Sequence, residues 1–352
     1  MNGLTSVMSR GQNFTFADLT DLSITTPTHQ TTGSSTTSSS SRGAGFYFRC
    51  AVIIIGVVGT AANGLVLYAM VASKQHRKHV LIFNQNLLNL ASSLFMSITY
   101  SVRLGNIYVD GMHGYLLCLT LLSEVPGWGP FLGSLINLAA ITVERYLKVV
   151  HPVFAKKNLR KWMIHSVIPF AWFAGIAVAA GVTIPTADVI DGVCYTLVFW
   201  KSHTAQMAFG IWYFLSFYVV ILLIVIFCYG RILVAIHRQA SVMAAHNAAG
   251  SVSAAQTQSK QIRTNVIKTM ILVSVLFAIT WTPAQVFHLL LNIHSTLSLR
   301  GKGFYAVLFI AYLYHCTNPF IYATNFDPVK RILLGLIPWR KTTQPSETVQ
   351  MT

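Results

Sequence analysis

Seven long apolar segments, each near the ~20 residues needed to cross a lipid bilayer, constrain this chain more than any other feature. Only 10% of its 352 residues are charged, whereas a soluble globular protein carries about 25%. So few charges cannot cover a water-facing surface, and the pattern predicts an all-α integral membrane protein, a seven-transmembrane helix bundle. We expect the spans at residues 47–73, 80–103, 116–149, 162–185, 205–237, 264–292 and 303–325.

The positive charges predict how this bundle is oriented. A formal net charge of +16 would suit a nucleic-acid-binding protein, but most of the 25 lysines and arginines lie in short loops between apolar segments. They concentrate on the side of the C-terminus, which the positive-inside rule places in the cytoplasm. Seven spans then put the N-terminus outside. We expect a multi-pass protein of the plasma membrane with no nucleic-acid partner.

The segments outside the spans contain few large apolar residues that could form a folded core. Residues 1–46 contain no signal-peptide-like apolar run and predict a disordered extracellular tail, in which Asn13 begins an N-glycosylation sequon. Residues 239–262, rich in Ala, Ser and Gln, predict a mobile third cytoplasmic loop. Residues 326–338 predict a short amphipathic helix on the inner membrane surface, and 339–352 a cytoplasmic tail.

The stretch from Ser134 to Pro152, SLINLAAITVERYLKVVHP, joins an apolar helix directly to a basic loop. A carboxylate beside a guanidinium, Glu144 and Arg145, is costly in a membrane helix unless each group is satisfied or lies at the interface. The pair therefore indicates a membrane edge and a working part of the protein. With Tyr146 next in line, the stretch resembles the third span of class A (rhodopsin-like) G-protein-coupled receptors, and within them the invertebrate orphan-type receptors.

Two proline-containing motifs extend this resemblance. The seventh segment holds the NPxxY pattern at Asn318-Pro319-Phe320-Ile321-Tyr322, and the sixth holds FxxxWxP at Phe277, Trp281 and Pro283. Proline kinks a membrane helix, and a bulky indole one turn away can act as a two-state packing element. The resemblance implies that coupling and activation rest on Glu144, Arg145, Tyr146, Pro152, Val153, Tyr229, Lys268, Phe277, Trp281, Pro283, Asn318, Pro319 and Tyr322.

The five cysteines are too few and too scattered for a disulfide scaffold or a zinc site. Cys118 opens the third span and Cys194 follows the fourth, both on the predicted extracellular side. The resemblance implies the bridge that is usual in this family between these two cysteines. Closing a loop of this length is worth ~4–5 kcal/mol by the chain-entropy model.

The sequence also departs from the family pattern. The second span has no carboxylate, so that Asn89 or Ser93 takes the place of the family's aspartate, and we expect no sodium or other metal site. The Pro- and Gly-rich residues 126–130 predict a bulge near the outer end of the third span. Arg263 stands where many relatives carry an acidic residue, so it cannot pair with Arg145, which would then rely on Glu144 alone.

The residues implied in ligand binding are mostly aromatic and uncharged. Gly127 stands at the aspartate position of amine receptors and Tyr312 at the retinal lysine position of opsins, which excludes a biogenic amine and retinal. Glu124 has two interpretations: a ligand contact, or a helix-end charge paired with Arg103. The implied ligand-binding residues are Glu124, Trp128, Phe131, Gln285, His288 and Tyr312.

The resemblance therefore implies a cell-surface receptor, not an enzyme and without a cofactor. It would bind an extracellular ligand, a peptide or a small molecule, and activate heterotrimeric G proteins, with membrane lipid and arrestin as further partners. The alternative is a multispan transporter or channel. Transporters usually show paired repeats and polar sites at the membrane midplane. The sequence shows no repeat and almost no charge in the middle of its spans.

Overall fold

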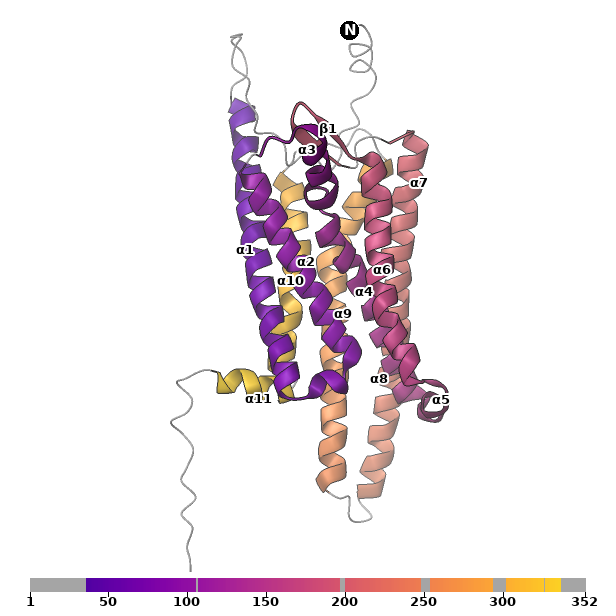
Figure 1. Ribbon diagram of the computed structural model, residues 1–352. Coiled ribbons are helices and arrows are strands. Elements are labelled where there is room, and N and C mark those ends of the chain that lie inside the picture. The colour runs from indigo at the N-terminus through magenta and orange to yellow at the C-terminus, as the bar shows by residue number, and fades with distance from the viewer. Residues whose placement is uncertain are drawn as a thin grey trace, which may run out of the picture.

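Seven long helical segments stand side by side in the part of the chain that the computed structural model describes (Figure 1). That part comprises residues 36–105, 107–196, 200–247, 254–293, 302–325 and 327–336. The long segments are α1 (Thr36–Ala72), α2 (Val80–Leu104), α4 (Val125–Val150), α6 (Lys161–Thr183), α7 (His203–Phe214) with α8 (Val220–Asn247), α9 (Ala254–Ile293) and α10 (Lys302–Asn325). A π-helical turn, Leu215–Val219, joins α7 to α8.

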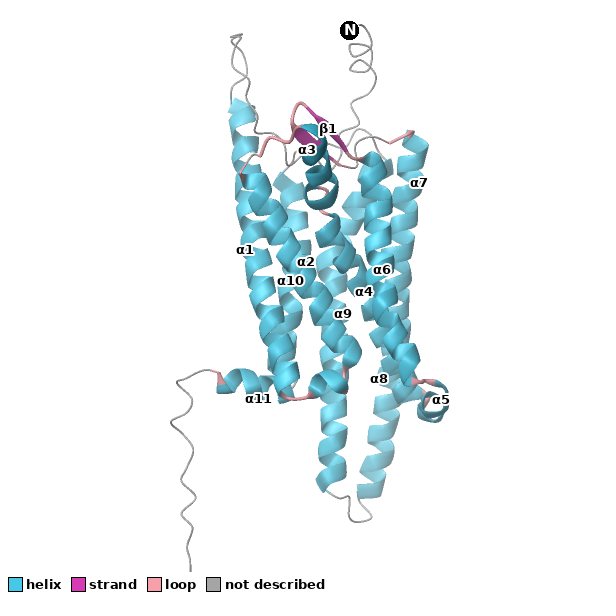
Figure 2. Cartoon of the chain, in the orientation of Figure 1, coloured by secondary structure: helices cyan, strands magenta, loops and turns pink. Residues whose placement is uncertain are grey.

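Shorter elements close the two ends of the bundle (Figure 2). One end carries α3 (Gly111–Leu117), a π-helical turn (Cys118–Leu122) and the antiparallel hairpin of β1 (Asp188–Ile190) and β2 (Val193–Tyr195). The opposite end carries α5 (Pro152–Asn158) and α11 (Asp327–Gly335). The remaining short elements are the 3-10 turns Gln75–Arg77 and Ile184–Thr186. These two ends carry different parts of the candidate site.

Helix α4 is the centre of the bundle, packed against α2, α6 and α8. Its contact with α6 is very close, because glycines meet there. A Cβ atom on Gly175 would lie 2.3 Å from the carbonyl oxygen of Gly129 and 2.9 Å from the Cα of Gly133. Small residues that let helix backbones approach are a common packing device in membranes.

Helix α2 contains many polar side chains, and these are buried inside the bundle. Five of the described helices are long and apolar enough to cross a membrane, and α2 and α10 complete the bundle beside them. Asn137 of α4 donates to the Gln85 Oε1 at 2.7 Å, and Asn84 donates to the Asn137 Oδ1 at 3.0 Å. Trp172 of α6 donates to the Asn84 Oδ1 at 3.1 Å. The polar residues of α2 thus tie three helices together in a medium that offers no water.

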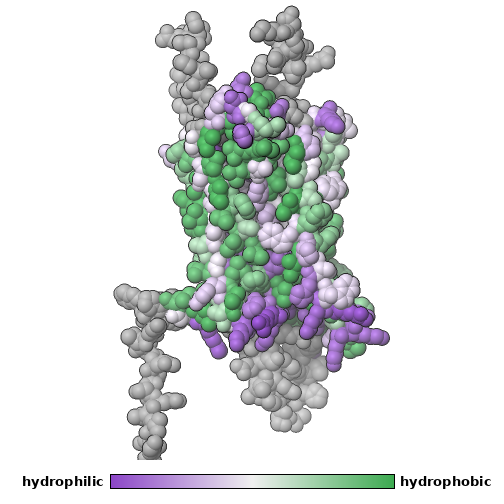
Figure 3. Space-filling model, in the orientation of Figure 1, coloured by the Kyte–Doolittle hydropathy of each residue, from purple (hydrophilic) through white to green (hydrophobic). Residues whose placement is uncertain are grey.

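The outer surface of the bundle suits lipid. Figure 3 shows apolar side chains around the middle of the molecule and hydrophilic ones towards its ends, most densely at the end that carries α5. Exposed basic residues at that end include Lys156, Lys157 and Lys161. Large apolar side chains such as Phe173, which is 75% exposed on α6, would be unfavourable in water.

The structure corrects two expectations about disorder. Helix α1 begins at Thr36, inside the predicted extracellular tail of residues 1–46. Helices α8 and α9 extend to Asn247 and from Ala254, so most of the predicted mobile loop is helical. Ala and Gln are good helix formers, and extending a helix that is already nucleated is easier than starting one.

The predicted short amphipathic helix is present as α11, which packs against α1 and α10. Val329 on this helix is fully buried, whereas Lys330 and Arg331 are exposed. Two-faced burial of this kind is what the mixture of basic and apolar residues predicts.

Candidate functional site

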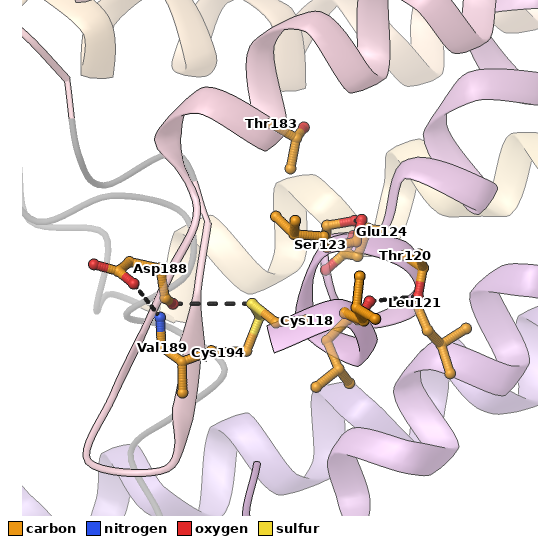
Figure 4. Close-up of a disulfide and its surroundings, with 12 residues drawn as sticks. Cys118, Thr120, Leu121, Ser123, Glu124, Thr183, Asp188, Val189 and Cys194 are labelled. Carbon is orange, nitrogen blue, oxygen red and sulfur yellow. Dashed lines mark hydrogen bonds between the residues drawn. A yellow bond between two sulfur atoms is a disulfide. The ribbon is translucent and has the colours of Figure 1, made fainter. Parts of the chain in front are cut away.

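The disulfide between Cys118 and Cys194 is present and joins the π-helical turn to β2 (Figure 4). Their Cα atoms lie 5.4 Å apart. An interruption near the outer end of the third span is present, but it lies at the π-helical turn and at the left-handed backbone of Glu124, with φ of 60°. Residues 126–130, from which a bulge was predicted, are themselves helical. This interruption sets the direction of the Glu124 side chain.

Glu124 is held inside the protein by two partners. Its Oε1 lies 3.0 Å from the Nη1 of Arg103, and its Oε2 accepts a hydrogen bond of 2.9 Å from the indole of Trp128. Arg103 also donates to the carbonyl of Leu122, while Arg49 donates to the carbonyl of Arg103 at 3.2 Å. The interpretation of Glu124 as the partner of Arg103 is therefore confirmed, and the same carboxylate also reaches the wall of a cavity.

This cavity lies between α4, α6, α7, α9 and α10 and encloses about 960 Å³, including its open mouth. It is called the outer cavity below, and the end of the bundle that carries the disulfide is called the outer end. Four of the six predicted ligand-binding residues line it: Glu124, Trp128, Gln285 and His288. Trp281 and Tyr213 also line it, although the sequence had suggested an activation role for the first and none for the second. Nothing in the sequence indicated that Tyr213 lines a cavity, because aromatic residues are common in apolar segments.

Phe131 and Tyr312 do not line the outer cavity, unlike the other four. Both contact the Trp128 ring, whose centroid lies 5.6 Å from that of Phe131 and 6.2 Å from that of Tyr312. Phe131 borders a much smaller neighbouring cavity instead. The hydroxyl oxygens of Tyr312 and Tyr100 lie 3.4 Å apart. Both aromatic residues therefore pack against Trp128.

A column of buried aromatic rings continues from the cavity into the bundle. Trp281 stacks on Phe131 with ring centroids 4.3 Å apart. Phe277 precedes Trp281 by one turn of α9, and its ring centroid lies 5.6 Å from that of Tyr314 and 6.4 Å from that of Tyr218. Pro283 lies inside α9, as predicted. The column brings the sixth-span motif and the outer cavity together.

Arg145 lies near the C-terminus of α4, at the end of the bundle that carries α5 and is called the inner end below, but its partner differs from the predicted one. Glu144 forms its ion pair with Lys148, one turn along the helix, so the expectation that Arg145 relies on Glu144 is wrong. Arg145 instead donates to the Nδ1 of His79 at 3.2 Å. A guanidinium has only donors, so this nitrogen must be unprotonated. Burial and the neighbouring Arg145 charge lower the pKa of His79 to about 4.

The other predicted coupling residues that the structure describes have partners or exposed positions of their own. The hydroxyl oxygens of Thr142 and Tyr229 lie 3.4 Å apart, and the hydroxyl of Tyr146 lies 3.1 Å from the Nε2 of His151. Pro152 begins α5, on which Val153 is 82% exposed. Lys268 is exposed as well. The inner end therefore presents exposed side chains on α5 and α9.

The predicted polar positions in the middle of the bundle are buried. Asn318 is fully buried, and Pro319 lies inside α10. Asn89 and Ser93 are both fully buried, and neither amide atom of Asn89 meets a hydrogen-bond partner among the described residues. Outside the described residues or side chains lie Asn13, Arg263 and Tyr322.

The comparisons with known proteins agree with this arrangement. Residues 62–322 match the family described as 7 transmembrane receptor (rhodopsin family). The chain is 26% identical to the melanin-concentrating hormone receptor 1 of Rattus norvegicus over 82% of this chain and 79% of that protein. It is 26% identical to the somatostatin receptor type 4 of the same species over 80% and 70%. The crystal structure of squid rhodopsin is similar in fold, with a TM-score of 0.68 at 18% identity, over 89% of this chain and 93% of that one.

Proposed function

Because the chain belongs to the rhodopsin family of seven-transmembrane receptors, we propose that it binds an extracellular ligand and activates heterotrimeric G proteins. It would do so in the plasma membrane, with the N-terminus outside and the C-terminus in the cytoplasm. The ligand is a peptide or a small molecule, and neither a biogenic amine nor retinal, since Gly127 and Tyr312 replace the residues that those ligands need. Two relatives are named as receptors for a hormone and for somatostatin, which supports an extracellular ligand.

One observation carries this proposal: Trp281 belongs both to the wall of the outer cavity and to the buried aromatic column. A ligand that contacts Trp281 differently in two arrangements of α9 would shift the balance between them by its difference in affinity. Movement of α9 would change the inner end, where Arg145 and the exposed face of α5 could bind a G protein. Arrestin and inner-leaflet lipid are further partners in this proposal.

The test is a ligand screen in cells that express the receptor, with dissociation of the G-protein subunits as the readout. Arg145→Ala should abolish the response while surface expression, measured by antibody labelling, stays unchanged. A response that survives in Arg145→Ala would contradict the coupling role. Solute or ion flux through the protein without any G-protein response would favour the transporter or channel alternative.

A further inference from the structure

We propose that the outer cavity takes an uncharged, largely apolar chemical group that carries a hydrogen-bond donor, and that it discriminates against charged groups. This proposal rests on the receptor function proposed above and names the chemistry of the ligand. The group could be a free small molecule or the end of a peptide, and both sources would present the same chemistry to the cavity.

The charge balance of the cavity excludes a cationic group. Among the described residues that line it, Glu124 is the one acidic side chain, and none is a lysine, an arginine or an aspartate. Both carboxylate oxygens of Glu124 already have partners, Arg103 and Trp128. The Arg103 and Glu124 side chains are only 7% and 9% exposed, so they neutralise each other away from water. A ligand cation would have to share this carboxylate with Arg103, which would place two positive charges side by side in a buried site with a single counter-charge.

An anionic group is excluded by the same carboxylate and by the remaining wall. The wall is built mainly of apolar and aromatic side chains, among them Leu132, Val178, Trp281 and Leu291. An unpaired charge loses its hydration there without compensation. Phenyl-like or aliphatic groups lose nothing comparable, and they can stack on Trp128 or Trp281.

Among the polar side chains of this wall, Gln285 carries a buried acceptor that is open to a ligand. Its side chain lines the cavity and is 2% exposed, and its Oε1 meets no hydrogen-bond partner among the described residues. The Tyr213 hydroxyl lies beside the same amide. A buried carbonyl oxygen without a partner is costly, so a ligand amide or hydroxyl that donates to it is favoured over an equally apolar group without a donor.

The test uses the full-length receptor in lipid nanodiscs and three probes with one carbon skeleton. These are 3-phenylpropanamide, which is neutral, 3-phenylpropylamine, which is cationic, and 3-phenylpropanoate, which is anionic. The neutral amide should raise the unfolding temperature progressively with its concentration, because the stabilisation grows as RT ln(1 + L/Kd), where L is the free ligand concentration. Both charged probes should bind at least about tenfold more weakly, because their charge is desolvated in the cavity.

Variants connect the preference to individual residues. Arg103→Met leaves Glu124 without its counter-charge and should reverse the preference in favour of the amine. The double variant Arg103→Met/Glu124→Gln removes both charges, guards against misfolding of the single variant, and should still prefer the amide. Gln285→Met should weaken binding of the amide by about tenfold, the loss of one hydrogen bond to a buried group.

Two results would overturn the proposal: an amine or carboxylate that binds the natural protein as well as the amide, or an amide that stabilises no variant at any concentration up to its solubility. An acetylated and amidated Ser-Gly-Ser-Phe peptide is then compared with 3-phenylpropanamide. Tighter binding of the peptide would indicate that a peptide end supplies the group, and tighter binding of the amide would indicate a free small molecule. Because binding is measured without a G protein, an intact probe preference in a receptor that fails to signal would contradict only the proposed receptor function.

Discussion

The two ends of this helix bundle hold their charges in opposite ways. At the outer end, Arg103 and Glu124 are a buried ion pair beside a disulfide that ties the hairpin to the bundle. At the inner end, Arg145 is held by a hydrogen bond to a neutral histidine, and Glu144 by a lysine whose side chain is 41% exposed. Breaking a buried ion pair typically costs about 3–5 kcal/mol, whereas an exposed pair contributes about 0–1 kcal/mol. The Glu144–Lys148 pair also lies within one helix, so charges hold the inner end together more weakly than the outer end.

The largest effect should come from the crosslink of the outer end. Cys118→Ala removes the bridge to Cys194 and should lower the free energy of unfolding by about 4–5 kcal/mol in the chain-entropy model. We expect most of the variant to be retained inside the cell, as surface labelling against total protein would measure. Cys228→Ala is the matched control, since Cys228 is a free buried thiol. Normal surface delivery of Cys118→Ala would mean that the outer end does not depend on its crosslink.

The glycine contact between α4 and α6 should be the next most sensitive feature. Gly175→Ala places a methyl group 2.3 Å from the carbonyl oxygen of Gly129, so the helices must move apart, at a cost of about 1–3 kcal/mol. The unfolding temperature of purified receptor measures this loss. On the same helix, a Cβ on Gly181 meets nothing within 4 Å, so Gly181→Ala should be neutral or slightly stabilising. Equal effects of the two substitutions would contradict tight packing at Gly175.

Most of this architecture could be predicted because the bilayer imposes length and polarity on each span. The helix order and the disulfide followed from apolar runs and a family pattern, whereas the interruption near the outer end lies before the Pro- and Gly-rich stretch that predicted it. What could not be predicted depended on contacts between helices. The pairing of Asn84 with Asn137 and Trp172 depends on how three helices are oriented about their own axes, which the sequence does not give. Polar residues in an apolar span indicate only which face of a helix points into the bundle.

The partner of Arg145 was missed for the same reason. Glu144 is adjacent to Arg145 in sequence, but neighbours along a helix point in different directions, whereas Lys148 lies one turn further on the same face. His79 comes from the start of another helix and carried no sequence signal. In the predicted third cytoplasmic loop, low hydrophobicity indicates mobility, whereas the helix propensity of Ala and Gln favours the helical ends that the structure has.

His79 offers the sharpest test of the inner end. His79→Leu removes the acceptor for Arg145, and should raise ligand-free G-protein activation by up to about tenfold, because a hydrogen bond to a charged group is worth about 1.5–3 kcal/mol and this one is partly hydrated. His79→Gln, which retains an acceptor, should stay close to the natural protein. G-protein activation at equal surface expression is the measurement. If His79→Leu leaves basal activity unchanged, the hydrogen bond does not hold the resting state.

The pH dependence of the same residue has a defined sign. The folded protein lowers the pKa of His79 from 6.5 to about 4, so the unfolded chain binds the proton first. Its contribution to stability is therefore complete above pH 6.5 and is lost as the pH falls towards 4. His79→Gln should remove this part of the acid destabilisation, as measured by unfolding temperatures across that range. An identical pH profile in the variant would show that His79 is not buried beside Arg145.

The smallest expected effect concerns Arg263, at the inner end of the sixth segment. The family pattern places an acidic residue there, opposite the arginine of the third helix, and Arg263 brings a like charge instead. Repulsion between charges at an aqueous interface is worth about 1 kcal/mol or less, which shifts a two-state population by about fivefold at most. Arg263→Glu should therefore lower ligand-free G-protein activation by up to that factor at equal surface expression, with Arg263→Gln intermediate. Since His79 and Arg263 would act on the same arginine, His79→Leu combined with Arg263→Glu should show less basal activity than His79→Leu alone. Basal activity that does not change in Arg263→Glu would mean that the hydrogen bond from Arg145 to His79, and not charge between the third and sixth helices, sets the resting state of the inner end.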